Sequence, residues 1–527
     1  MNQSKTIVRL VIAAIVSFAA QAVSAAKTTI DGVVYHCNTE NMKASVQGFA
    51  DDNGKSKLVI PDKITYKNKS YKVTSVANEA FRGYPGLKTV VIGNNVETIG
   101  TDAFTSSGVK NLTLSTRLKI IGAAAFGGTS VVDVELPASL EIIRAKAFFN
   151  CGSLQSVRFS GSKLTEIGEQ AFAWCRALTS FSMPASVKTL GKEAFDDCTV
   201  LKSVDISPSL TVIPDLAFNL CPLEYIHIPP SVTQIGEAAF CGHATSTLII
   251  PGTVKTIGDS AFELGQGIYL VLNEGIVNIG YRAFASSKIV AVKMPASAVN
   301  VGESVFSECY SLKQAELSPS LTVIPRKMFW DTDLSSITIP DGVTHIGESA
   351  FYNNMKLWRI DFPPSLRVIG DKAFQYSGSL ENFVLNEGLQ KIGARAFGDC
   401  KTHELDIPSS VTEIGELAFI GFSYLHSVTA KNPVPPVITE DSFSSWTYED
   451  ARLVVPNGSE DAYASAPGWR RFKTIGDTSG IDGAQLEDVD EVETRYFDVN
   501  GMEIANPVTG EVYIRVHDGK AEKILLK

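Results

Sequence analysis

Apolar residues recur along most of this chain in one repeated arrangement. Each repeat reads Leu-x-x-Val/Ile-x-Ile, then Pro or Ser, then Val-x-x-Ile-Gly-x-x-Ala-Phe, as in residues 223–240 and 334–351. The final phenylalanine returns every 22, 23 or 24 residues, at positions 81, 104, 126, 148, 172, 195, 218, 240, 262, 284, 306, 329, 351, 374, 397, 419 and 443. A fixed period of this length indicates a repeat architecture.

The first part of each repeat has the alternation of a short β-strand. Its last two apolar positions are separated by a polar one, which is the period of a strand with one buried face. A single coil cannot bury these side chains, whereas stacked coils bury them continuously. We therefore expect a solenoid with a parallel sheet on one side, short 3₁₀ or irregular turns on the other, and phenylalanine rings between layers.

Glycine usually stands four residues before the phenylalanine, as at Gly100 and Gly236. It indicates either a tight turn or a close approach of neighbouring coils. Arg144, Pro214 and Pro325 occupy the same position in other repeats. Because Arg144 is accepted there, a positive φ is not strictly required.

The full repeat resembles a known family, the BspA-like bacterial leucine-rich repeat proteins, also called the Treponema pallidum type. The pattern L-x-x-[VI]-x-[IL]-[PS]-x-[SG]-[VL]-x-x-I-G-x-x-A-F-x-x-C is matched nearly whole at 201–218 and 334–351, and copies cover residues 81–443. The resemblance implies a leucine-rich-repeat-like, right-handed stack of coils. It also implies a role in adhesion to host proteins and other bacteria.

The chain divides into six parts on this pattern. An array cannot end on an exposed apolar coil, so we expect β-rich caps at both ends, with Trp469 and Phe472 covering the last coil. The C-terminal strands, joined through Asn-Gly, resemble tails of secreted Bacteroidota proteins, and a plain β-module fits equally well. The expected parts are a signal peptide (1–25), an N-terminal β cap (26–75), an array of about 16–17 coils (76–445), a C-terminal cap (446–476), an acidic linker (477–494) and a small β tail (495–527).

The N-terminus predicts export. Lys5 and Arg9 precede an apolar run of 14 residues, which is shorter than the roughly 20 needed to span a bilayer, and Val23-Ser24-Ala25 fits a cleavage site. No cysteine closely follows the run, so a lipid anchor is not expected. The predicted location is secreted or on the surface of a bacterium. The net charge of −10, without clusters of Lys or Arg, argues against nucleic acid as a partner.

Six of the eight cysteines stand three residues after an anchor phenylalanine. Ser, Thr and Asn take that position in other repeats, so we expect small, buried, free thiols. Stacked coils would still allow a disulfide such as Cys175–Cys198. No cysteine pair has zinc-ligand spacing, and we expect no metal or cofactor. The cysteines concerned are Cys151, Cys175, Cys198, Cys221, Cys309 and Cys400.

The histidines are scattered and do not accompany any nucleophile or metalloprotease motif. The carboxylates occupy variable positions, as expected of solvated surfaces. We therefore predict that the chain is not an enzyme.

The outward positions of the predicted sheet are polar or small in most repeats. Three consecutive repeats differ, and we predict that their residues bind a protein or glycan partner. Two alternatives remain: β-rich residues suit any strand, or another segment covers them. The rival function is a structural envelope or spacer protein with no ligand site. The candidate residues are Tyr225, His227, Ile249, Tyr269 and Val271, beside Thr247.

Overall fold

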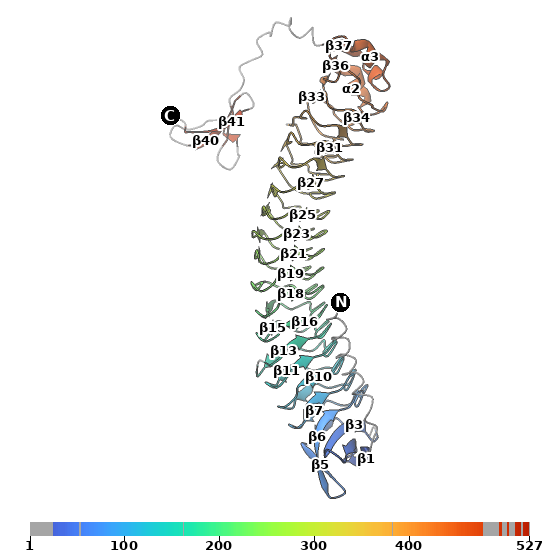
Figure 1. The fold of residues 1–527 in the computed structure, drawn as a ribbon, viewed down its shortest axis with the longest axis vertical. Helices are drawn as coiled ribbons and strands as arrows, with labels where there is room; N and C mark the ends of the chain where they lie inside the picture. Colours follow the sequence, from blue (N-terminus) through green and yellow to red (C-terminus); the bar gives the residue numbers. More distant parts are fainter. Residues whose placement is uncertain are drawn as a thin grey trace, which may run out of the picture.

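The computed structural model describes residues 25–51, 54–161, 163–381 and 383–477, and four strands beyond them. Most of this part is one elongated, gently curved rod of stacked coils (Figure 1). The fold is a leucine-rich-repeat solenoid, as the sequence predicts. The predicted signal peptide and acidic linker lie outside the described residues, except for Ala25 and Asp477.

Most coils contribute a strand to each of two parallel ladders, both of which are interrupted at several points, whereas the sequence predicted one sheet. The Leu-x-x-Val-x-Ile segments form the first, which we call the wide ladder. Its strands are β4 (Lys57–Ile60), β7 (Thr89–Ile92), β9 (Asn111–Thr113), β11 (Asp133–Leu136), β13 (Ser156–Phe159), β15 (Ser180–Ser182), β17 (Ser203–Asp205), β20 (Thr247–Ile250), β22 (Tyr269–Leu272), β24 (Ala291–Lys293), β26 (Gln314–Glu316), β28 (Ser336–Thr338), β30 (Arg359–Asp361), β33 (Glu404–Ile407) and β35 (Ser427–Ala430).

The Val-x-x-Ile segments form two-residue strands, which we call the narrow ladder. They follow the wide strands after the Pro or Ser turn. These strands are β8 (Thr98–Ile99), β10 (Ile120–Ile121), β12 (Ile142–Ile143), β14 (Glu166–Ile167), β16 (Thr189–Leu190), β18 (Val212–Ile213), β19 (Gln234–Ile235), β21 (Thr256–Ile257), β23 (Asn278–Ile279), β25 (Asn300–Val301), β27 (Val323–Ile324), β29 (His345–Ile346), β31 (Val368–Ile369), β32 (Lys391–Ile392) and β34 (Glu413–Ile414).

The residue after each narrow strand decides whether the ladder continues. The backbone N–H of Gly122 donates to the carbonyl of Ile99 at 2.8 Å, and Arg144 makes the same bond to Ile121 at 3.0 Å. Pro214 and Pro325 have no N–H to donate. The narrow ladder stops just there, between β16 and β18 and between β25 and β27.

The glycines at this position allow close approach of neighbouring coils. A Cβ atom built on Gly122 would lie 2.6 Å from the backbone of the preceding coil. None of these glycines has a positive φ. Of the two roles that the sequence suggested, close approach is therefore the correct one.

The anchor phenylalanines form one continuous stack through the core. Successive rings lie 5.1–5.7 Å apart with planes within 19° of parallel, from Phe81 to Phe443. This spacing falls in the range of favourable aromatic pairs. The stack thus joins every coil to its two neighbours.

The backbone around each phenylalanine is a repeated turn with no helix among the described residues of the array. Asp102 and Ser106, two residues before and after Phe104, have φ values of 54° and 56°. Left-handed backbone costs about 1–2 kcal/mol for such residues. It aims the three N–H groups of 102, 104 and 106 at carbonyls of the next coil, at 2.7–2.8 Å.

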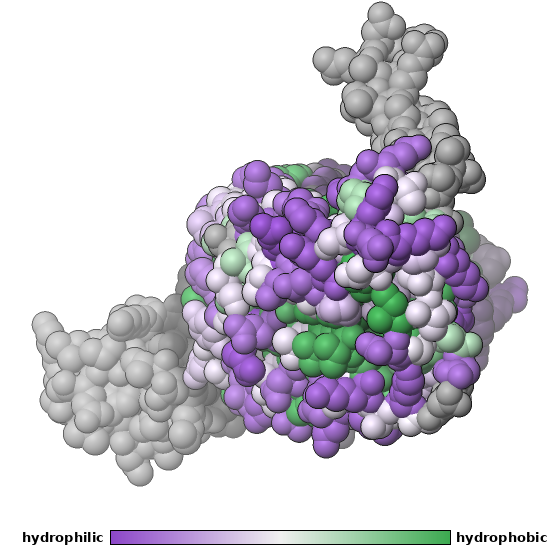
Figure 2. Space-filling view, turned by 90° about the horizontal axis from the view of Figure 1, so that it is seen from below, coloured by the Kyte–Doolittle hydropathy of each residue, from purple (hydrophilic) through white to green (hydrophobic). Residues whose placement is uncertain are grey.

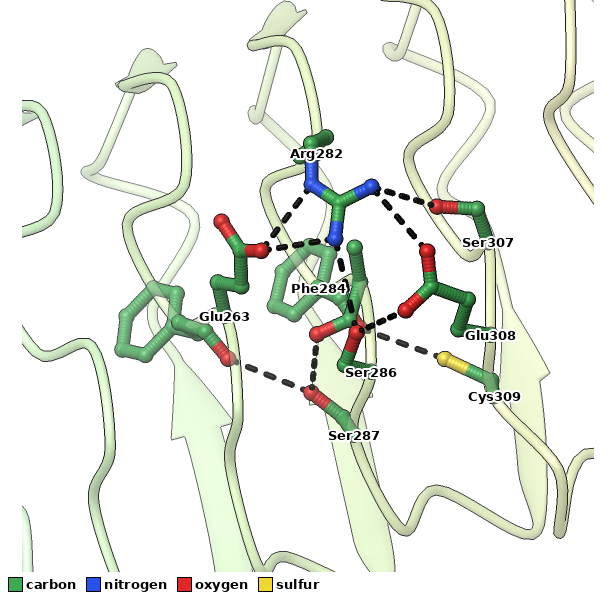
Figure 3. Close-up of polar contacts among 10 residues, drawn as sticks. Glu263, Arg282, Phe284, Ser286, Ser287, Ser307, Glu308 and Cys309 are labelled. Atoms are coloured by element: carbon green, nitrogen blue, oxygen red, sulfur yellow. Dashed lines mark hydrogen bonds and ion pairs between the residues drawn. The ribbon is translucent and has the colours of Figure 1, made fainter.

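The residue three positions after the anchor phenylalanine is a small hydrogen-bond donor in most coils. Cys309 Sγ donates to the carbonyl of Phe284 and Ser287 Oγ to that of Phe262, both at 3.2 Å (Figure 3). Asn354 Nδ2 reaches the carbonyl of Phe329 at 2.7 Å in the same way. The need for a small donor explains why Cys, Ser and Asn interchange here.

A charged cluster also links three coils on this turn side. Arg282 lies between Glu263, at 2.7 Å, and Glu308, at 3.4 Å (Figure 3). Burial alone would lower the pKa of Arg282, but the two carboxylates raise it, so the guanidinium remains charged. Ser286 donates to Glu308 at 2.8 Å.

Six strands close the N-terminal end. Phe49 lies edge-on to the first anchor ring, Phe81, with centroids 4.9 Å apart. Seen from this end, the surface is mainly hydrophilic around one apolar area (Figure 2). The strands are β1 (Ala25–Ile30), β2 (Val33–Asn38), β3 (Lys43–Phe49), β4, β5 (Lys63–Tyr66) and β6 (Lys69–Val76).

The last coil is covered by Trp469 and Phe472, as the sequence predicts. Both are buried, and their ring centroids lie 5.9 and 5.4 Å from that of Phe443. Trp469 Nε1 donates to the carbonyl of Pro436 at 2.7 Å. The elements are α2 (Ser445–Asp450), β36 (Arg452–Val455), α3 (Glu460–Ser465), η1 (Trp469–Arg471) and β37 (Thr474–Asp477).

The C-terminal segment contains the strands expected before and after its Asn-Gly and Asp-Gly sequences. All pair antiparallel, β38 with β39 and β40, and β40 with β41. They are β38 (Arg495–Phe497), β39 (Glu503–Ile504), β40 (Val512–His517) and β41 (Lys520–Leu525).

Candidate binding surface

The wide ladder exposes every residue that the sequence singled out. Tyr225 and Tyr269 are each 66% exposed, and Ile249 and Val271 are about half exposed. His227 is exposed as well. Inward residues of the same segments, such as Ile226 and Leu248, are buried, as the alternation predicts.

The strand register brings three of these residues together. Ile249 pairs with Val271 in adjacent strands β20 and β22, and Thr247 pairs with Tyr269. Tyr269 in turn stands beside Ala291 of β24. Ile249, Tyr269 and Val271 thus share one continuous surface.

Tyr225 and His227 lie across an opening from that surface. Tyr225 makes an isolated bridge to Ser203, but no pairing joins its segment to β20 among the described residues. The narrow ladder stays closed here, because β18, β19 and β21 pair in order. At this point strand pairing is interrupted on the wide side alone.

This opening forms a hollow of about 580 Å³, which we call the Tyr225 hollow. Tyr225 and His227 line one side, and Thr247 and Ile249 line the other. Three of the five predicted residues thus face a shared depression. The sequence alternation could not show it, because it assumes evenly paired strands.

A second and larger depression follows along the same face. It has a volume of about 1030 Å³ and extends from Tyr269 and Val271 to Trp358 and Arg359; we call it the Tyr269 trough. Trp358, 48% exposed, was missed from the sequence. The alternation predicts Arg359 and Asp361 as the outward residues of this strand. Trp358 stands one position before Arg359, where the alternation predicts no outward side chain.

A buried histidine lies behind Tyr269. His243 occupies the position of the small donor, and it is 2% exposed. Its Nδ1 has no hydrogen-bond partner, and burial lowers its pKa to about 4. The ring faces Phe262 edge-on at 5.9 Å. A cavity of about 10 Å³ beside it is also lined by Tyr269.

The cysteines do not form a reactive group. All eight lie in the described residues, buried and without disulfides, which agrees with the free-thiol interpretation over the disulfide alternative. Burial raises the pKa of Cys151 and Cys241 to about 11 and that of Cys309 to about 12. These groups are protonated at neutral pH, and a thiol is a poor nucleophile.

The described residues contain neither a cluster of metal ligands nor a membrane-spanning helix. In the described part of the chain, no three His, Cys, Asp or Glu side chains converge as metal ligands. No helix within those same ranges has the length and apolar character to cross a bilayer.

Family comparison agrees with this architecture. The model of the BspA type leucine rich repeat region, which contains six copies of the repeat, matches residues 61–162, 119–247, 238–358 and 344–459. Those matches span well over half of the chain. The chain belongs to the BspA type leucine-rich repeat family.

Solved structures of other repeat proteins resemble this BspA type chain. A leucine rich cell surface protein of Faecalibacterium prausnitzii is 25% identical, with a TM-score of 0.41, covering 68% of this chain and 94% of its own. A leucine-rich repeat protein of Bacteroides ovatus is 22% identical, with a TM-score of 0.47 and coverage of 77% and 94%. The T. pallidum leucine rich repeat protein is 21% identical, with a TM-score of 0.28 and coverage of 55% and 91%. A search of curated proteins found no match.

Proposed function

We propose that this protein is an exported, non-catalytic binding protein of a bacterial surface. Its wide face holds an extracellular protein or glycan through Tyr225, His227, Ile249, Tyr269 and Val271. Adhesion is the role that the resemblance to BspA-like proteins implies. The apolar N-terminal run between residues 10 and 23 supports export.

The exposed apolar cluster carries this proposal. Most coils present polar or small pairs on the wide face, such as Ser203 with Asp205 and Gln314 with Glu316. The coils of Tyr225 to Val271 instead expose aromatic and branched side chains beside two hollows. Localised exposed apolar surface, rich in tyrosine, is typical of contact sites. A spacer would need no such local departure.

A binding screen tests the proposal. The full chain without residues 1–25 is passed over a panel of immobilised extracellular matrix proteins and soluble glycans, with serum albumin as the negative control. Saturable binding to at least one member is expected. Absence of binding to every member of the panel would overturn the proposal and favour the structural spacer.

A further inference from the structure

The Tyr269 trough has two aromatic ends and a low floor. Tyr269 stands at one end and Trp358 at the other, on coils four rungs apart. Rungs of a parallel sheet are about 4.8 Å apart, so the trough is about 19 Å long. It is therefore an elongated depression, aligned with the axis of the rod.

The register explains why the floor is low. Ala291 lies directly beside Tyr269, and Ser336 lies directly beside Arg359. Each of these small residues stands next to a large one on the neighbouring rung. Gln314, between them, is the longest neutral side chain of the floor.

The charges of the floor cancel within the trough. Lys293 pairs with Glu316 at 2.6 Å, and Arg359 pairs with Asp361 at 3.0 Å. Two cations and two anions leave no net charge. A polyanion or a strongly charged peptide would find no uncompensated partner here.

The neutral polar groups of the floor remain available to a ligand. Among the described residues, no hydrogen bond joins the side chains of Gln314 or Ser336 to another residue, and both are exposed. Sites for small neutral ligands commonly combine aromatic walls with a few polar groups that fix orientation. The trough has this combination.

We propose that the Tyr269 trough binds a neutral, extended oligosaccharide. A chain of sugar rings offers apolar C–H faces to Tyr269 and Trp358, and its hydroxyl groups can exchange hydrogen bonds with Gln314 and Ser336. The length of the trough accommodates several linked rings. This inference rests on the proposed binding function and specifies its ligand class.

Affinity electrophoresis is the first test. The full chain without residues 1–25 is run in native gels containing a neutral mannan, galactan, xylan or β-glucan, and, in a separate gel, the polyanion heparin. At least one neutral polysaccharide is expected to retard the protein, and heparin is not. Calorimetry with oligosaccharides cut from that polysaccharide then gives an affinity.

Substitutions locate the site. Trp358→Ala and Tyr269→Ala are each expected to weaken that affinity at least tenfold. Trp174→Ala is the matched control, because Trp174 is 40% exposed but does not line the trough. Melting temperatures of all three variants show whether the fold is retained.

Three results would overturn the inference, and they differ in what they imply. If the protein binds a matrix protein or peptide but no neutral polysaccharide retards it, the ligand is not a glycan, and the proposed binding function still stands. If Trp358→Ala and Tyr269→Ala are both retarded as strongly as the wild type, the glycan binds outside the Tyr269 trough. No binding to any protein or glycan defeats the proposed function as well.

Discussion

The imidazole of His243 occupies the space that a side chain at Gly265 would need. A Cβ atom built on Gly265 would lie 2.4 Å from Nε2 of His243, and one built on Gly267 would lie 3.4 Å from Cε1. At the position of this histidine most other repeats have Cys, Ser, Thr or Asn, and at the position equivalent to Gly267 they have Leu, Val, Ile or Thr. A large residue in one coil is thus compensated by small ones in the next.

This relationship predicts that Gly265→Ala destabilises the array. Gly265 does not have a positive φ, so the cost comes from overpacking against His243, about 1–3 kcal/mol. Denaturant unfolding measures the loss. Gly152→Ala is the control, because nothing lies within 4 Å of its added Cβ. Equal losses from Gly265→Ala in the wild type and in a His243→Ala background would contradict the coupling.

His243 also predicts a pH dependence of stability. Its pKa of about 4 in the folded chain lies below the ordinary value of 6.5, because burial disfavours the charged ring. The unfolded chain therefore binds more protons between these values, and stability falls as the pH drops from 6.5 towards 4. The loss at pH 5 is about 2 kcal/mol. In His243→Asn this contribution is absent, so thermal melts of variant and wild type should converge as the pH falls from 7 to 5. A constant difference would contradict this account.

The donor position after the phenylalanine predicts a ranking of substitutions at Cys175. Its thiol donates to the carbonyl of Phe148 at 3.2 Å. Cys175→Ser keeps a donor, whereas Cys175→Val removes one of the two hydrogen bonds to that carbonyl, which still accepts from the N–H of Cys151, at a cost of about 0.5–1.5 kcal/mol. Thermal melts should therefore place the serine variant closer to wild type. The opposite order would show that size, not hydrogen bonding, decides this position.

Much of the fold could be predicted from local repetition. The phenylalanine period predicted a stack in which each ring meets its neighbours, and Phe104 lies 5.2 Å from Phe126. Alternation placed Tyr225 and Val271 outward because both stand in segments of strict period two. Regular patterns of this kind repeat the same physical environment in every coil.

The remaining features depend on how neighbouring coils contact each other, and the sequence pattern gives little sign of them. The opening beside Tyr225 is a local loss of pairing in segments whose apolar pattern is regular. The trough depends on which large and small residues become neighbours in the register, such as Tyr269 and Ala291. Pro214 departs visibly from the repeat pattern. Its effect on the narrow ladder follows only from the structure, in which the glycine at this position of other coils donates its N–H to the preceding coil.

The binding role of the wide face is tested most directly by removing its two tyrosines. The affinity for the strongest ligand found in the matrix-protein and glycan panel is measured for the wild type, for the double variant Tyr225→Ser/Tyr269→Ser, and for Tyr310→Ser. Tyr310 is 64% exposed but lies outside both hollows, which makes it the matched control. Loss of exposed aromatic anchors should weaken binding at least tenfold, about 1.4 kcal/mol, in the double variant and leave the control unchanged. A double variant that binds as tightly as the wild type would contradict the account.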